Sequence, residues 1–170
     1  MIYYLFDASA LILFYQKANK KLDEIFVSKA KNESFIYVPQ FCVPEVFNTF
    51  ARLYYRDKKI SEDIYNQYCV AFKEHVSSRK VIYCYDLHRY HNLNAHQLFI
   101  YDHTIPYDHI NSTKSLSTLD ILIISMGMEL KRIHPPQDVF LVTADKRMQT
   151  VCKACPSEFP QVIFVKEKNN

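Results

Sequence analysis

Short apolar runs alternate with amphipathic segments along the whole chain. The runs are four or five residues long and continuously apolar, which is typical of strands covered on both faces of a sheet. They are IYYLF at 2–6, FIYVP at 35–39, VIYCY at 81–85, VFLVT at 139–143 and VIFV at 162–165. The pattern therefore predicts five buried strands.

Between these runs, apolar residues recur at the three-to-four-residue spacing of a helix. Helices are expected on this basis at 9–16, 19–32, 44–56, 61–79 and 117–130, and the third and fourth should form a helical hairpin. Strands that alternate with helices form right-handed crossovers and a parallel sheet. The sequence thus predicts an α/β fold, a three-layer α/β/α sandwich with a mostly parallel central sheet, in a single domain at 1–170.

Composition narrows the function classes. The 170 residues are 49% apolar and 23% charged, and the net charge of +3 permits a polyanionic partner without demanding one. No apolar run approaches the ~20 residues of a membrane span, so no membrane partner is expected. The only glycine is Gly127, inside an apolar helical stretch, which excludes the glycine-rich phosphate loops of Rossmann and P-loop proteins.

The five cysteines are scattered and odd in number, which argues against a disulfide framework and favours a reducing cytoplasm. Cys152 and Cys155 form half of a zinc or redox motif, but no second CxxC is present, so a structural role is favoured.

A segment rich in histidine and tyrosine, at about 86–115, fits the alternating pattern least well. It holds five of the seven histidines: His88, His91, His96, His103 and His109. Their spacing matches no compact zinc pattern, so a polar helix with a surface loop is the simpler interpretation. The alternative is a contact with substrate, because His, Tyr and Arg89 can stack on unpaired bases.

Four carboxylates stand at the ends of predicted elements. Asp7 follows the first strand directly, Asp145 follows the strand at 139–143 after one residue, Glu45 opens the helix after the second strand, and Asp120 lies in the first turn of the buried helix. Taken singly, each has a structural explanation: an N-cap for Asp7 and Asp145, a favourable helix dipole for Glu45, and a capping box with Ser117 for Asp120.

Taken together, the four acids predict a metal site, because the carboxyl ends of parallel strands share one edge of the sheet. Four acids there would repel one another unless a cation lay among them, and all-oxygen ligands suit Mg²⁺ or Mn²⁺. On a mildly basic protein, this combination indicates phosphodiester hydrolysis.

The segments FDASALI, PEVFNTF, STLDILIISMGMEL and LVTADKRM, in that order, resemble the four signature segments of PIN-domain nucleases, and the chain is similar to VapC-type toxin ribonucleases. The resemblance implies an Mg²⁺- or Mn²⁺-dependent endoribonuclease that is the toxin of a toxin–antitoxin pair. It also implies that Asp7, Glu45, Asp120 and Asp145 are catalytic metal ligands, and that Ser9 and Thr143 orient ligands or waters. The 86–115 segment is then interpreted as an insertion. Some members of the family have two acids where VTADKRM has one Asp, so the resemblance does not decide whether a second metal ion is bound.

The expected partners are RNA, an antitoxin protein and a second copy of the chain. Lys146 and Arg147 follow Asp145 directly and either hold the RNA backbone or are solvated surface charges, with Arg89 and Lys114 also near the predicted site. A stripe of apolar residues is either core or a groove for an antitoxin helix or a second copy; its members are Phe41, Phe47, Phe50, Leu53 and Tyr54.

Three other functions are weighed against the toxin nuclease. One is an RNA-processing PIN nuclease that is not a toxin, and another is a non-catalytic RNA-binding PIN protein, whose signature would be a missing acid. A phosphotransferase or phosphatase with Asp7 as nucleophile is disfavoured, because Ser9 stands where a second acid is usual.

Overall fold

The computed structural model describes residues 1–105 and 115–166, and this part of the chain is built around a parallel sheet of five strands. The strands are β1 (Ile2–Phe6), β2 (Ser34–Pro39), β3 (Tyr83–Tyr85), β4 (Val139–Thr143) and β5 (Gln161–Phe164). Their order across the sheet is β3-β2-β1-β4-β5, and every neighbouring pair is parallel. The predicted parallel sheet is confirmed, with β1 at its centre.

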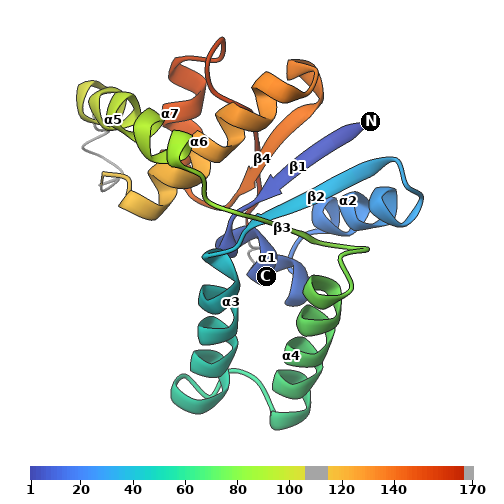
Figure 1. The fold of residues 1–170 in the computed structure, drawn as a ribbon. Coiled ribbons are helices and arrows are strands. Elements are labelled where there is room, and N and C mark those ends of the chain that lie inside the picture. Colours follow the sequence, from blue (N-terminus) through green and yellow to red (C-terminus); the bar gives the residue numbers. More distant parts are fainter. Residues whose placement is uncertain (106–114, 167–170) are drawn as a thin grey trace.

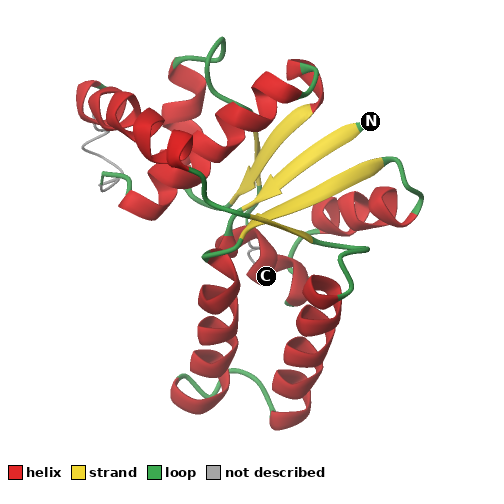
Figure 2. Ribbon diagram, in the orientation of Figure 1, coloured by secondary structure: helices red, strands yellow, loops and turns green. Residues whose placement is uncertain are grey.

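Helices cover both faces of the sheet, as Figures 1 and 2 show. On one side lie α1 (Ala8–Tyr15), α2 (Lys20–Ala30), α3 (Cys42–Ala51) and α4 (Glu62–Ser77), and on the other lie α5 (Arg89–Thr104), α6 (Thr118–Ile133) and α7 (Lys146–Ala154). Two shorter elements complete the described chain: the π-helical turn η1 (Arg52–Arg56) and the 3-10 turn η2 (Pro136–Asp138). The chain winds from β1 to β3 in one direction and from β3 to β5 in the other, so right-handed crossovers place the two helix sets on opposite faces. The predicted three-layer sandwich is confirmed.

Most helix starts are marked in the sequence by a capping side chain. Asp7, Asn19, Ser61, Ser117 and Asp145 each accept a hydrogen bond from a backbone N–H in the first turn of the following helix. Such caps satisfy N–H groups that have no partner within the helix. They explain why the helix starts could be located to within a residue or two.

The apolar stripe of α3 and η1 packs within the chain. Phe50 is fully buried and Leu53 is 7% exposed, whereas Phe41, Phe47 and Tyr54 are half-buried. Phe47 lies against Phe72 of α4, with ring centroids 4.9 Å apart, so α3 and α4 form the predicted hairpin, which projects from the sheet in Figure 1. The core interpretation therefore accounts for most of the stripe.

The single glycine has a packing role in α6. A Cβ at Gly127 would come within 2.8 Å of Pro160 Cγ, so only glycine lets α6 approach the segment that leads into β5. Among the described residues, no helix is both long and apolar enough to cross a membrane.

Candidate active site

The fold brings the four predicted carboxylates into one cleft. Strands β1 and β4 are neighbours, so Asp7 and Asp145 at their carboxyl ends lie at the same edge of the sheet. Glu45 reaches this edge from the first turn of α3, and Asp120 from the first turn of α6. All four line a cleft of about 240 Å³, together with Ser9 and Ser117. Residues separated by more than a hundred positions therefore share one site.

Asp7 lies at the bottom of this cleft and is 5% exposed. Its carboxylate accepts hydrogen bonds from Ser9 Oγ at 2.8 Å to both oxygens, from Ala10 N at 2.8 Å and from Thr143 Oγ1 at 2.5 Å. Burial raises the pKa of Asp7 to about 6, and the charge of Asp120 adds to this, although the hydrogen bonds pull the pKa down. The carboxylate is thus held firmly but ionises with difficulty.

Burial and neighbouring negative charges also raise the pKa of Asp120 and of Glu45. Burial raises the pKa of Asp120, and the neighbouring charges of Asp145 and Asp102 raise it further. For Glu45, burial and then the charge of Asp120 raise the pKa. Because the charge of one acid raises the pKa of the next, a cation in the cleft would stabilise the ionised forms of these carboxylates.

Ser9 and Thr143 connect the ends of β1 and β4. Thr143 Oγ1 accepts from Asp145 N at 2.9 Å and donates to Asp7, while Ser9 Oγ accepts from Ala144 N at 3.0 Å and donates to Asp7. Both hydroxyls therefore fix the orientation of Asp7 relative to Asp145. This is the arrangement expected of residues that orient metal ligands.

In Asp120 and Asp145, helix capping involves only one of the two carboxylate oxygens. Asp145 Oδ1 accepts from Arg147 N and Met148 N, and Asp120 Oδ2 accepts from Ser117 N and Oγ. Within the described residues, Asp145 Oδ2, Asp120 Oδ1 and both oxygens of Glu45 take part in no hydrogen bond. The structural and the functional interpretations of these acids are thus compatible.

The donor set is all-oxygen, which suits Mg²⁺ or Mn²⁺. In the part of the chain that the structure describes, no three His, Cys, Asp or Glu side chains are arranged so that they could hold a metal directly. Mg²⁺ does not require such a cage, because it keeps several waters and binds through one or two carboxylates. The residues therefore fit a hydrated Mg²⁺ held partly through water, and they do not fit a zinc site with three direct ligands.

Arg147 is not at the rim of the cleft, so its predicted contact with the RNA backbone is wrong. Its side chain is 4% exposed, and Nε donates to Asp102 Oδ1 at 2.7 Å while Nη2 donates to the Asp102 carbonyl. Asp102 also accepts from Leu116 N, so the pair joins α7 to both α5 and the segment before α6. Lys146 is exposed and its role stays a prediction, whereas Lys114 lies outside the described residues.

The histidine-rich segment at 86–115 contains the expected polar helix, which is α5 at Arg89–Thr104. His91 is fully buried, accepts from His88 N through Nδ1, and together with the Tyr85 hydroxyl it contacts Glu129 Oε2. His91 therefore holds α5 to α6 and β3. Residues 106–114, including His109, lie outside the described residues.

The cysteine pair of α7 shows no metal-binding arrangement. Cys152 is buried, Cys155 is half-buried, and all five cysteines are free. Burial raises the pKa of the Cys152 thiol to about 12, which makes it unreactive at neutral pH.

Comparison with known proteins identifies the class of fold. No family model matches the chain, and no curated protein matches it. Among solved structures it is similar to a chain in the crystal structure of VapBC2 from Rickettsia felis bound to a DNA fragment from their promoter, with a TM-score of 0.58 and 12% identity.

That match covers 96% of this chain and 98% of the other. The chain therefore shares its overall fold with that chain, and the predicted PIN-like α/β fold is confirmed. At 12% identity the likeness shows the fold alone, so function has to be argued from the acidic cleft.

Proposed function

We propose that this chain is a metal-dependent endoribonuclease that hydrolyses RNA phosphodiester bonds with Mg²⁺ or Mn²⁺. One observation carries the proposal: four carboxylates from four separate elements line one cleft at the carboxyl edge of the sheet. Among the described residues, no Lys, Arg or His forms an ion pair with any of the four. In this proposal, a cation from solution neutralises the charge of the four carboxylates.

Each side chain has a role in this proposal. Asp7, Glu45, Asp120 and Asp145 hold the metal, directly or through water, while Ser9 and Thr143 keep Asp7 in a single orientation. When bound, the metal supplies Lewis-acid stabilisation of the phosphate charge and lowers the pKa of water. Without such a metal, the acids would repel the phosphate.

The substrate class is argued from the charge of the protein and of the cleft. A negatively charged phosphodiester can approach an acidic site only when a metal ion lies between them, and the net charge of +3 is compatible with a polyanionic substrate. The exposed Lys146, next to Asp145, contributes to holding the RNA backbone in this proposal.

We also propose that the chain is a toxin with an antitoxin partner and that it forms a homodimer. The similar solved structure is named as VapBC2, bound to a promoter DNA fragment, and the PIN-like fold supports the same kind of partner here. Co-expression with the neighbouring reading frame, followed by light scattering on the purified species, would measure both. A strictly monomeric chain with no co-purifying small protein counts against this assignment.

The central experiment measures cleavage of end-labelled single-stranded RNA by the purified protein. Activity should disappear in EDTA, return with Mg²⁺ or Mn²⁺, and fall by roughly 10³-fold or more in Asp7→Asn, because the substitution removes a ligand charge from the catalytic unit without changing its volume. Asp63→Asn is the matched control, since Asp63 is exposed on α4, and it should cleave normally.

The outcomes separate the alternatives. Full activity of Asp7→Asn in Mg²⁺, or of the wild-type chain in EDTA, rejects the metal nuclease. RNA binding without cleavage in either metal supports the non-catalytic RNA-binding alternative. Cleavage without any antitoxin partner supports an RNA-processing nuclease that is not a toxin.

A further inference from the structure

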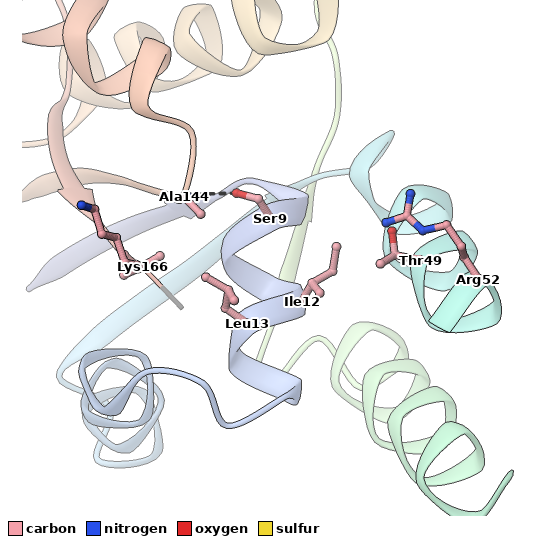
Figure 3. Close-up of a pocket in the computed structure, with 8 residues that line it drawn as sticks. Ser9, Ile12, Leu13, Thr49, Arg52, Ala144 and Lys166 are labelled. Carbon is pink, nitrogen blue, oxygen red and sulfur yellow. Dashed lines mark hydrogen bonds between the residues drawn. The ribbon is translucent and has the colours of Figure 1, made fainter. Parts of the chain in front are cut away.

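A second hollow shares Ser9 with the acidic cleft, and Figure 3 shows the residues that line it. Its volume is about 540 Å³, and the two hollows are neighbours because Ser9 lines both of them. Figure 3 shows Arg52 of η1 and Lys166, after β5, on opposite sides of it, with Ile12 and Leu13 of α1 between them. We refer to this hollow as the Arg52–Lys166 trough.

The two basic side chains of the trough are available to a ligand. The Arg52 side chain is 45% exposed, and its ion pair with Asp57 is long, at 3.8 Å between Nε and Oδ2, whereas Arg56 Nε lies 2.8 Å from Asp57 Oδ1. Lys166 is exposed, and its Nζ lies 5.7 Å from the centroid of the Phe164 ring. Within the described residues, no acid pairs with Lys166.

The charge changes sign across Ser9. The cleft on one side holds four carboxylates, whereas the trough on the other holds two cations, several aliphatic side chains and the hydroxyl-bearing Thr49. A metal-bound scissile phosphate fits the first environment, and the next phosphate of the same strand, which has no metal, needs the second. The aliphatic side chains offer contact area to a sugar or a base face but no hydrogen bonds to base edges.

We propose that the Arg52–Lys166 trough binds the nucleotide next to the scissile phosphate of single-stranded RNA. Arg52 and Lys166 hold its phosphate, and Ile12 and Leu13 contact its sugar and base. The proposal rests on the proposed nuclease function and adds the path of the strand beside the cleft. Ser9 and Thr49 are the lining residues with hydroxyl groups, and the other contacts to a base come from aliphatic side chains, so we expect only a weak preference among bases.

The test uses the full chain with Arg52→Gln, Lys166→Gln and the double variant. The control is Lys73→Gln/Lys153→Gln, which removes the same charge from two exposed lysines on α4 and α7 that do not line the trough. Binding of a short fluorescent RNA is measured by anisotropy in EDTA over a range of salt concentrations, so that no cleavage occurs. KM and kcat for cleavage are measured separately in Mg²⁺.

Removal of one cation that neutralises a phosphate should reduce the salt slope of single-strand binding by about 0.7, so the double variant should show a slope smaller by about 1.4. Its KM should rise about tenfold, the scale of two exposed ionic interactions, while kcat stays near the wild-type value because the carboxylates are untouched. Arg52→Lys keeps the charge and should restore most of the slope. The control double variant should keep the wild-type KM and show a smaller reduction of the slope.

The proposal that the trough binds RNA is rejected if the wild-type chain cleaves RNA and the double variant has the same KM and the same salt slope of binding as the wild-type chain. It is also rejected if the double variant no longer binds the antitoxin but keeps its RNA affinity, which would assign the surface to a protein. A wild-type chain that neither binds nor cleaves RNA refutes the proposed function itself, and that result is visible before any variant is made.

Discussion

Asp7 and Asp102 are both almost completely buried, at 5% and 1% exposure, but their surroundings differ. Asp102 has an arginine: Arg147 Nε donates to it at 2.7 Å, and Leu116 N donates to its other oxygen at 3.0 Å. Within the described residues, Asp7 accepts from two hydroxyls and one backbone amide, and the charge that acts on its pKa is that of another acid, Asp120. The two carboxylates serve different purposes.

A buried carboxylate is costly unless it is paired and hydrogen-bonded. Asp102 meets both conditions within the chain, so it holds α5, α7 and the start of α6 together. Asp7 meets only the second, and burial raises its pKa to about 6. Asp102 therefore has its positively charged partner within the chain, whereas for Asp7 we propose that a cation from solution is the partner.

Removing one partner of the internal pair should have the largest effect. Asp102→Ala leaves the Arg147 guanidinium buried without its carboxylate, which costs about 3–5 kcal/mol of unfolding free energy. Urea denaturation followed by circular dichroism measures this change. The double variant Asp102→Leu/Arg147→Met should recover most of it, since neither charge remains to be desolvated. A decrease of less than about 1 kcal/mol in the single variant would show that the pair is unimportant for stability.

The second largest effect is expected in the pH dependence of stability, which should distinguish Asp7 from Asp102. The pKa of Asp7 is higher in the folded chain than in the unfolded chain, so the folded chain binds more protons at this group. The contribution of protonated Asp7 to the free energy of unfolding is therefore fully present below about pH 4, and it is lost as the pH rises through about 6. In metal-free protein, the wild-type chain should therefore lose about 3 kcal/mol relative to Asp7→Asn between pH 4 and 7. Denaturation curves at several pH values measure the difference. Parallel pH profiles for the two proteins would mean that Asp7 ionises normally.

A metal should stabilise the cleft but not the internal pair. At a Mg²⁺ concentration 100 times its dissociation constant, the wild-type chain should gain about 2.7 kcal/mol, and Asp7→Asn should gain much less. Thermal melting at pH 7 with increasing Mg²⁺ detects this as a rise in Tm. Asp63→Asn should respond like the wild-type chain. An equal rise in Asp7→Asn would place the metal elsewhere.

The smallest effect is expected from the hydroxyl that joins Asp7 to Asp145. Thr143→Val keeps the volume but removes the donor to Asp7 and the acceptor for Asp145 N, and it should weaken Mg²⁺ affinity roughly 10- to 100-fold. Thr150→Val is the matched control, because the Thr150 hydroxyl bonds only to the Lys146 carbonyl. Calorimetric titration with Mg²⁺ measures both affinities. If both variants bind Mg²⁺ equally well, Thr143 has no orienting role.

The sequence by itself determined the elements and the positions of the four acids. Strands 2–6 and 139–143 agree with the structure residue for residue, and Asp7 and Asp145 stand as caps directly after them or one residue on. These features are local, since a buried strand and a helix cap each depend on a few consecutive residues. Once a parallel sheet was predicted, the shared edge of its strands implied that the acids meet.

Only the tertiary structure decided which charges are buried and which face solvent. Lys146 and Arg147 are adjacent and alike in sequence, yet Lys146 is exposed and Arg147 is buried against Asp102, 45 positions away. Likewise, Arg52 and Lys166 belong to segments far apart in the chain, and they flank one trough because η1 and the end of β5 both lie beside α1. Burial and ion pairing depend on contacts between distant segments, which no local pattern records; for that reason the acidic cleft could be predicted and the basic trough could not.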